Sequence, residues 1–182
     1  MRRARLLIPI VLLLLTGCHT VGQNVPGVDN FAKVDDAVFR GAQPTKQGVT
    51  DTLRQQGVRT IVNLRDDPNP AEPAWAREAG MTYIEIPSKA TKVEPAKVAE
   101  FLRDVETAPR PIFVHCRQGR DRTGLDVAVY RIVDVGWSRE DALKDLYAHG
   151  YHWAAFPGIA KYVKSFDPQA VAPAKEVKQT GG

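Results

Sequence analysis

The sequence predicts an α/β fold with a mostly parallel central sheet of four to five strands flanked by helices. Two observations lead to this expectation. Short apolar runs typical of buried strands alternate with longer stretches of helical periodicity, and most of the helical stretches end at a glycine. Such alternation is typical of a parallel sheet covered on both faces. The chain has 182 residues, which is enough for one domain with a leader and a tail.

Each predicted element is recognisable from its own residues. Strand-like runs lie at 37–41, 59–64, 81–86 and 112–115. Helix-like stretches lie at 46–56, 72–79, 94–106, 123–135 and 138–149, and residues 157–166 complete the fold. The stretch 94–106 shows the helical period most clearly, because its apolar residues recur three or four positions apart. They are Val98, Phe101, Leu102 and Val105. Ser138 is placed to cap the helix that follows it.

The N-terminus is typical of an export signal. Three arginines within the first five residues precede the apolar run 6–15, which is too short to span a bilayer as a stable helix. The segment Leu15-Thr16-Gly17-Cys18 resembles the bacterial lipobox, which implies cleavage before Cys18 and a lipid such as palmitate on that cysteine. His19 resembles the residue found in lipoproteins sorted to the outer membrane of Gram-negative cells. We therefore expect an exported protein, anchored by lipid on the periplasmic side of that membrane.

The chain divides into four parts by composition. Residues 1–17 are the expected signal peptide, and residues 18–30 are the lipidated cysteine with a flexible, Gly- and Pro-punctuated tether. Residues 31–166 form the expected folded domain, and residues 167–182 a disordered tail. Removal of the signal arginines lowers the formal net charge from +4 to +1. No basic run with interleaved aromatic residues remains, so we expect no nucleic-acid partner.

The stretch with the clearest chemistry lies between the strand-like run 111–114 and the helix that begins near Thr123. It is His115-Cys116-Arg117-Gln118-Gly119-Arg120-Asp121-Arg122-Thr123, called here the signature loop. Backbone amides in a strand–loop–helix turn can form a nest that binds an anion, with the positive end of the helix behind it. The same environment favours a thiolate. Cys116 at the edge of such a nest is a nucleophile aimed at the phosphorus of a bound phosphate.

The signature loop resembles that of the cysteine-based protein tyrosine phosphatases, His-Cys-x5-Arg-Thr/Ser, and most of all the small dual-specificity branch with its atypical bacterial members. The run Phe39-Arg40-Gly41-Ala42-Gln43-Pro44-Thr45 also resembles the opening of the bacterial members. The resemblance covers residues 31–166 but is sharp only in the loop. It implies a phosphotyrosine protein phosphatase-like fold and hydrolysis of phosphomonoesters through a phosphocysteine intermediate, without a cofactor or a metal.

The resemblance also assigns roles to individual residues. It implies that Cys116 is the nucleophile and that Arg122 binds two phosphate oxygens, an arrangement that lysine cannot reproduce. The backbone amides of Arg117, Gln118, Gly119, Arg120 and Asp121 would complete the phosphate site. The hydroxyl of Thr123 would stabilise the thiolate. His115 either orients the loop from behind or is a buried histidine with satisfied hydrogen bonds.

The proton donor for the leaving oxygen is less clear from the sequence. Most tyrosine phosphatases carry an aspartate on a separate loop, but the corresponding stretch here, 87–93, has no carboxylate. Asp121 is one candidate, because the order Gly-Arg-Asp-Arg-Thr resembles Gly-Lys-Asp-Arg-Thr loops in which the aspartate is proposed as the acid. Asp66 or Asp67, at the end of another strand, is the second candidate. Both sites are also compatible with loop-stabilising carboxylates paired to arginine, in which case no dedicated acid exists.

Several functions remain open at this stage. The preferred one is a tyrosine or dual-specificity protein phosphatase with a phosphorylated protein as its substrate. Arg117 and Arg120 add positive charge, as in relatives that act on phosphoinositides or inositol phosphates, although they are equally compatible with a solvated pair. A pseudophosphatase that binds phosphate without turnover is the third. The cluster Tyr147, His149, Tyr151, His152 and Trp153 is interpreted as packing and not as a metal site.

Overall fold

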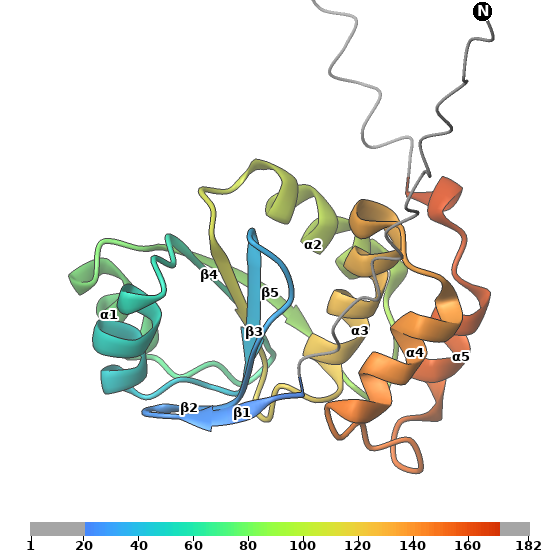
Figure 1. The fold of residues 1–182 in the computed structure, drawn as a ribbon, viewed down its shortest axis with the longest axis horizontal. Helices are drawn as coiled ribbons and strands as arrows, with labels where there is room; N and C mark the ends of the chain where they lie inside the picture. Colours follow the sequence, from blue (N-terminus) through green and yellow to red (C-terminus); the bar gives the residue numbers. More distant parts are fainter. Residues whose placement is uncertain (1–20, 172–182) are drawn as a thin grey trace, which may run out of the picture.

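A six-stranded sheet crosses the middle of the molecule, with helices on both of its faces (Figure 1). The structure is a computed structural model that describes residues 21–171. Its strands are β1 (Gln23–Val25), β2 (Val28–Lys33), β3 (Val38–Gly41), β4 (Thr60–Arg65), β5 (Thr82–Ser88) and β6 (Ile112–His115). Its α-helices are α1 (Glu72–Glu78), α2 (Pro95–Thr107), α3 (Arg122–Tyr130), α4 (Arg139–Ala148) and α5 (Pro157–Ser165). Shorter helical turns are η1 (Gly48–Leu53), η2 (Arg131–Val135) and η3 (Pro168–Ala170).

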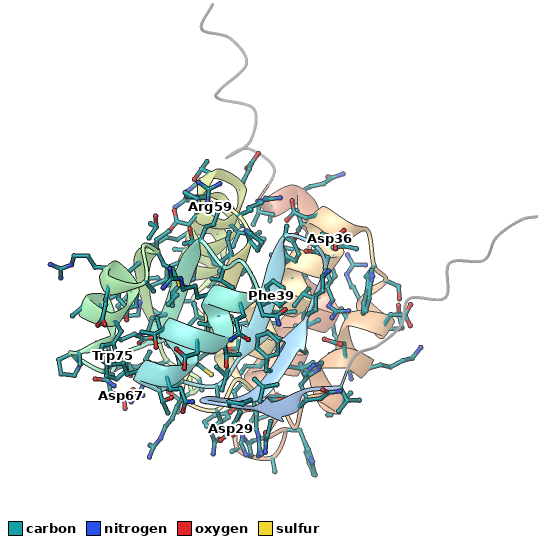
Figure 2. All side chains as sticks on the ribbon, turned by 60° about the vertical axis from the view of Figure 1, so that its left-hand side comes forward. Asp29, Asp36, Phe39, Arg59, Asp67 and Trp75 are labelled. Carbon is teal, nitrogen blue, oxygen red and sulfur yellow. The ribbon has the colours of Figure 1, made fainter. Side chains whose placement is uncertain are left out.

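The strand order is β1-β2-β3-β6-β4-β5, and β3, β6, β4 and β5 run parallel. The predicted, mostly parallel sheet is therefore confirmed. Figure 2 shows its direction: Arg59 and Asp36, which precede β4 and β3, lie at one end of the molecule, and Asp67, which follows β4, lies at the other. β6 is central, between β3 and β4, so Cys116 emerges at the carboxyl edge of the sheet, where ligands bind in open α/β folds.

The two faces of the sheet have separate apolar cores, and β6 contributes to both. Phe113 packs on one face with Leu53 of η1 and Ala76 of α1. Its neighbours Ile112 and Val114 pack on the other face, with the apolar side of α2 and with α3, α4 and α5. Successive side chains of a strand point to opposite faces, so a strand buried on both sides is apolar throughout. This explains the continuous run Ile-Phe-Val just before the signature loop.

The N-terminal segment differs from the expectation. The sequence analysis places residues 18–30 in a flexible tether, but β1 and β2 form an antiparallel hairpin that joins β3 at the edge of the sheet. Pro26 and Gly27 make the turn between them, with Gly27 at φ 77°, and a proline–glycine pair favours such a turn. The structure thus corrects the domain boundary: the sheet begins at Gln23 and has two strands beyond the parallel four.

Other predictions concern residues outside the described range. These are the signal peptide 1–17, the lipidated Cys18 and residues 172–182 of the expected tail. The first part of that tail contains the helical turn η3. Among residues 21–171, no helix is both long enough and apolar enough to cross a membrane.

Candidate active site

The signature loop connects β6 to α3, and its carbonyl groups are held from behind. His115 Nδ1 lies 3.3 Å from the carbonyl oxygen of Cys116, and the Gln43 amide donates to that of Arg117 at 3.3 Å. Asn30 Nδ2 donates to the carbonyls of Gln118 and Gly119 at 3.2 and 3.1 Å. Four consecutive carbonyls therefore point toward the protein. We call the side of the loop that holds them the floor; its residues are Asn30, Arg40, Gln43, Glu72 and His115.

The backbone amides of the loop have the opposite orientation. Within residues 21–171, no protein group accepts a hydrogen bond from the amides of residues 117–121. Gly119 and Asp121 are buried, and buried amides normally have a partner, so amides without one beside an open pocket mark a place where a ligand can accept their hydrogen bonds. The N-terminus of α3, which begins at Arg122, adds its positive end to the same spot. This arrangement is the anion nest that the sequence predicts.

Gly119 allows the loop to approach the sheet closely. Its φ of 68° is in the left-handed region, and a Cβ there would lie 2.4 Å from the backbone of Gly41. A side chain at this position is therefore excluded by both backbone conformation and space. The contact also gives the run that begins at Phe39 a structural role, because Arg40 and Gly41 form the surface on which the loop rests.

Arg40 is the central residue of the floor. Its guanidinium is fully buried, donates to the Gly119 carbonyl at 2.9 Å, and contacts Asp145 of α4 at 3.3 Å. Arg131 reaches the same carboxylate at 3.4 Å. Burial lowers the pKa of Arg40 to about 10, although the charge of Asp145 opposes this effect. Arg40 remains charged at neutral pH and ties the loop to α4.

A second buried pair lies under Cys116. His115 Nε2 is 2.9 Å from Glu72 Oε1, and both side chains are inaccessible to solvent. Burial raises the pKa of Glu72, but hydrogen bonding and charge from His115, with help from Gln43 and Tyr83, outweigh burial and hold that pKa below its usual value. His115 is buried and paired, and it also holds the Cys116 carbonyl, so its contacts are compatible with both of the roles left open for it.

Cys116 lies at the bottom of a pocket of about 310 Å³. The pocket is lined by Ala90, Cys116, Arg117, Gln118, Asp121, Arg122 and Phe156. The thiol is unpaired and only 3% exposed, so a ligand reaches it only through this pocket. The Thr123 hydroxyl is fully buried and has no hydrogen-bond partner among the described residues. This hydroxyl, at the start of α3, is therefore available as a donor, and it is the group expected from the resemblance to stabilise the thiolate.

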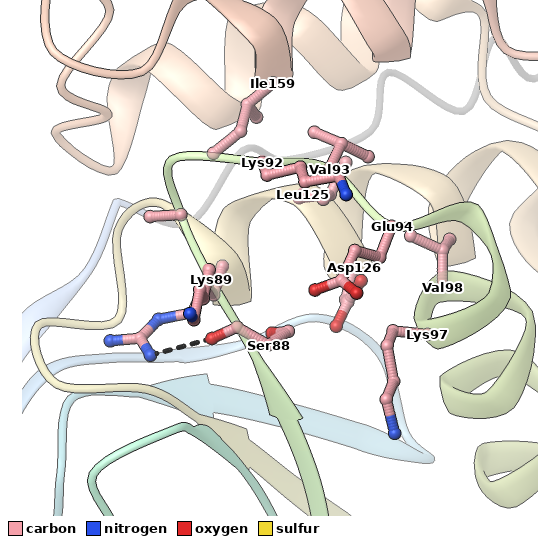
Figure 3. A pocket seen from close by; sticks show the side chains of 12 residues that line it. Ser88, Lys89, Lys92, Val93, Glu94, Lys97, Val98, Leu125, Asp126 and Ile159 are labelled. Carbon is pink, nitrogen blue, oxygen red and sulfur yellow. Dashed lines mark hydrogen bonds between the residues drawn. The ribbon is translucent and has the colours of Figure 1, made fainter.

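Arg122 is anchored through one nitrogen only. Its Nη1 donates to Asp66 at 2.7 Å and to the Ser88 carbonyl at 3.0 Å, the bond dashed in Figure 3. Among the described residues, Nε and Nη2 have no partner, and the side chain lines the Cys116 pocket. The edge formed by Nε and Nη2 is the one that binds two oxygens of a phosphate side by side. The guanidinium is thus held from behind with this edge available.

The three candidate acids occupy different surroundings. Asp121 lines the pocket with Cys116, and its carboxylate contacts His152. Asp66 is paired with Arg122, and Asp67 forms two hydrogen bonds with Arg65 at 3.0 and 2.7 Å. Both Asp66 and Asp67 are partly exposed and do not line the pocket. Asp121 is therefore the candidate that shares a pocket with the nucleophile.

The rim of the loop consists of Arg117, Gln118 and Arg120, all exposed. These side chains also line a second, polar hollow of about 230 Å³ beside the Cys116 pocket. Asn24, Asp29 and Asn30 of the N-terminal hairpin form its other wall. Two arginines in one polar hollow next to a phosphate site suit a second anionic group of a substrate.

A third, narrower pocket lies under the segment that connects β5 to α2 (Figure 3). Asp126, one helical turn beyond Arg122, lines it together with Lys97 and Val98. The side chain is 5% exposed, and burial raises the pKa of Asp126 well above its usual 3.8. No group of the described chain forms a hydrogen bond or ion pair with this carboxyl, so nothing offsets the effect of burial on its pKa.

The cluster of aromatic and histidine residues at 147–153 is only partly buried in the core. His149 and Tyr151 are buried as expected, but Trp153 is 65% exposed and His152 reaches Asp121. Among residues 21–171, no three His, Cys, Asp or Glu side chains gather into a metal site. The sequence analysis missed the contribution of Asn30, Glu72 and His152 to the loop. Local patterns carry no signal for them, because each meets the loop from a distant part of the chain.

Comparisons with known proteins agree with this geometry. A family model described as a DSP-PTPase phosphatase fused to NAD+ kinase (PTP-NADK) matches residues 21–154. The dual specificity protein phosphatase TpbA of Pseudomonas aeruginosa strain UCBPP-PA14 is 34% identical over 125 residues, which cover 67% of this chain and 55% of TpbA. The chain thus spans about half the length of that relative.

Solved structures show the same fold. The crystal structure of P. aeruginosa TpbA in complex with pTyr has a TM-score of 0.72 and 29% identity, and covers 87% of this chain and 98% of that one. The core catalytic domain of the S. cerevisiae PP-IP phosphatase SIW14, in complex with citrate, has a TM-score of 0.66 and 18% identity, and covers 81% and 93%. At that identity the second likeness concerns the fold alone.

Proposed function

The chain belongs to the DSP-PTPase family of cysteine-based, dual-specificity-like phosphatases, and we propose that it hydrolyses phosphomonoesters through a phosphocysteine intermediate on Cys116. The observation that carries this proposal is the run of five amides at residues 117–121 that have no acceptor within residues 21–171, in the loop that follows a buried thiol. An anion nest alone binds phosphate, and a buried thiol alone is inert. Together they place a nucleophile where phosphorus would lie.

The reaction has two steps. In the first, the sulfur of Cys116 attacks phosphorus while Arg122 and the loop amides bind the phosphate oxygens, and the bond to the leaving oxygen breaks. Asp121 supplies the proton that the leaving oxygen needs. In the second step water attacks phosphorus, gives its proton to Asp121 and releases the thiolate. Its position in the pocket wall makes Asp121 the preferred acid over Asp66 and Asp67.

The decisive experiment measures turnover and binding separately. The purified full chain should release nitrophenolate from p-nitrophenyl phosphate in the presence of a metal chelator. Cys116→Ser should abolish turnover and keep the affinity for inorganic phosphate, because the nest and Arg122 remain. A wild-type chain that binds phosphate or vanadate without hydrolysing any ester would instead be a phosphate-binding pseudophosphatase.

The preferred substrate is a phosphorylated tyrosine, serine or threonine side chain of a protein. A second candidate, an inositol phosphate or phosphoinositide, is favoured by the hollow that Arg117 and Arg120 line beside the Cys116 pocket. The values of kcat/KM on phosphotyrosine peptides and on inositol phosphates that carry several phosphates distinguish the two. A preference for the peptides supports the first substrate class, and a preference for the inositol phosphates supports the second.

We also propose that the domain acts at a membrane through a lipid on Cys18. The segment Leu15-Thr16-Gly17-Cys18 and the basic, apolar leader before it support this proposal. The expected site is the periplasmic side of the outer membrane of a Gram-negative cell. Metabolic labelling with a palmitate analogue should tag the wild-type chain and not Cys18→Ala, and fractionation of the two membranes should place it. A chain that takes up no lipid would contradict the anchor without affecting the phosphatase.

A further inference from the structure

His152, in the segment between α4 and α5, contacts the carboxylate of Asp121 twice. Its backbone amide donates to Oδ1 at 2.9 Å, and its ring nitrogen Nδ1 lies 2.9 Å from Oδ2. The side chain of Asp121 is only 10% exposed, and the same segment supplies Phe156 to the Cys116 pocket. The wall of the pocket that carries the carboxylate is therefore built by two parts of the chain, thirty-one residues apart.

The two contacts of the imidazole fit the state in which Asp121 has given up its proton. A carboxylate only accepts hydrogen bonds, so Nδ1 then donates to Asp121. Nε2 lies 3.3 Å from Nη1 of Arg120, which only donates, so Nε2 is the acceptor. His152 thus bridges the carboxylate of the loop and a loop arginine.

The segment that carries His152 is held against the signature loop. Gly150 has a φ of 81°, and a Cβ there would lie 3.2 Å from Nε of Arg120. Asn30, which supports the Gly119 carbonyl, also donates to the His149 carbonyl at 3.3 Å. The distance between His152 and Asp121 is thus fixed from both sides. Packing alone would not require the ring nitrogen to face the carboxylate.

We propose that His152 is a positioning residue for the proton donor: it holds Asp121 in the wall of the Cys116 pocket and stabilises the carboxylate that forms when Asp121 gives up its proton. This inference rests on the proposed function. In the first step the sulfur–phosphorus bond forms, the bond to the leaving oxygen breaks, and the proton of Asp121 moves to that oxygen. The new carboxylate accepts both hydrogen bonds of His152. In the second step the same carboxylate takes the proton of the attacking water.

Two substitutions distinguish the contribution of Nδ1 of His152 from that of Nε2. In His152→Asn the amide nitrogen lies near the position of Nδ1, so the hydrogen bond to Asp121 is kept. In His152→Gln the amide reaches the position of Nε2, and the bond to Asp121 is lost. The backbone donor remains in both variants. Trp153→Phe, at the exposed neighbouring position, controls for changes in the segment.

The readout is the dependence of kcat/KM on the leaving group, because kcat/KM reports the step in which the leaving oxygen departs and not the later hydrolysis of the phosphocysteine. Phenyl phosphate needs a proton on its leaving oxygen, whereas nitrophenolate leaves almost without one. His152→Gln should lower kcat/KM on phenyl phosphate by about ten- to hundredfold, the effect of one hydrogen bond to a charged group. Its kcat/KM on p-nitrophenyl phosphate and its inhibition by vanadate should change little. His152→Asn should restore most of the loss, and Trp153→Phe should match the wild type on both esters.

A double-mutant cycle tests whether His152 acts through Asp121. Asp121→Asn should itself lower kcat/KM on phenyl phosphate, and His152→Gln should add little in that background, because its partner is already gone. Equal losses on both esters, or the same further loss in the Asp121→Asn background, would overturn the role of His152 and leave the proposed function standing. A wild-type chain inactive on both esters would overturn the proposed function, and the role of His152 with it.

Discussion

The floor of the signature loop consists of buried or half-buried side chains with polar contacts, whereas its rim consists of exposed side chains. On the floor, Arg40, Glu72 and His115 are fully buried, and each contacts another charged or polar group. On the rim, Arg117, Gln118 and Arg120 are exposed and face two pockets. The floor binds the carbonyls of the loop, and the rim stands beside its amides.

This difference teaches which side controls which property. A floor residue acts on the ligand only through the backbone that it holds, so its loss should affect folding and turnover together. Apart from Arg120, which contacts His152, the rim residues have exposed side chains without a hydrogen bond to the described protein, so their loss should affect the choice of substrate and leave folding intact. Buried polar networks and solvated charges differ in the same way in their energetics, because an unpaired charge is costly only where water is excluded.

The largest effect is expected for Arg40→Met. The substitution keeps the length of the side chain but removes the Arg40 charge beside Asp145, which keeps its contact with Arg131, and one of the two donors to the Gly119 carbonyl, which keeps Asn30. Breaking a buried pair from one side costs about 3–5 kcal/mol, so urea unfolding should show a loss of this order, together with reduced phosphatase activity. Lys33→Met, which removes a partner from an exposed pair with Asp36, is the matched control and should unfold like the wild type. An Arg40→Met chain as stable as the wild type would remove the distinction between floor and rim.

A smaller loss is expected for Glu72→Gln, and it should depend on pH. Because its contacts hold the pKa of Glu72 below the usual 4.5, the carboxylate stabilises the fold at neutral pH, and this contribution is lost as the pH falls through the lowered value. The variant should lose about 1–3 kcal/mol at pH 7 and show a flatter decline of stability in acid. Unfolding free energies measured from pH 3 to pH 7 check both points. A parallel pH curve for the two chains would mean that Glu72 is not the titrating group.

The features of the fold and of the site that can be predicted from the sequence are the local ones. The parallel strands and the boundaries of the helices follow from apolar periodicity and from glycines that end helices, and the nest of amides follows from the strand–loop–helix order. Cys116 and Arg122 lie where the spacing in the loop places them, in one pocket. Each of these features depends on residues close together in the chain.

The rest depends on contacts between distant residues. Asn30, Arg40, Glu72 and His152 come from four different segments, and nothing in their neighbours indicates that they meet one loop. The N-terminal hairpin was missed for another reason. Its polar strands lack a clear alternation, and the Pro26-Gly27 turn was interpreted as part of a linker, although the same pair is the turn of a hairpin.

Asp126 is a buried residue whose removal should raise the stability of the fold, in contrast to Arg40 and Glu72. It is buried like a floor residue but has no partner within residues 21–171, and burial raises its pKa, so the carboxyl destabilises the fold increasingly as the pH rises above 3.8 and through the raised value. Asp126→Asn removes this ionisation and should raise the stability at pH 7 by about 1 kcal/mol. The gain should vanish near pH 3, where the carboxyl is protonated in both folded and unfolded chains. A variant that is less stable at pH 7 would show that the carboxyl has a stabilising partner.

The smallest effect on stability is expected for the rim. Arg117→Gln should leave the free energy of unfolding within about 0.5 kcal/mol of the wild type, because the exposed guanidinium has no partner among the described residues. Its effect should instead fall on binding. Arg117 lines both the Cys116 pocket and the second hollow, so a substrate with several phosphates should lose more of its kcat/KM than p-nitrophenyl phosphate, mainly through KM. Gln118→Ala, in the same two pockets but uncharged, separates charge from contact. If Arg117→Gln lowers kcat/KM on both substrates equally, the second hollow does not select the substrate, and the rim serves only the reacting phosphate.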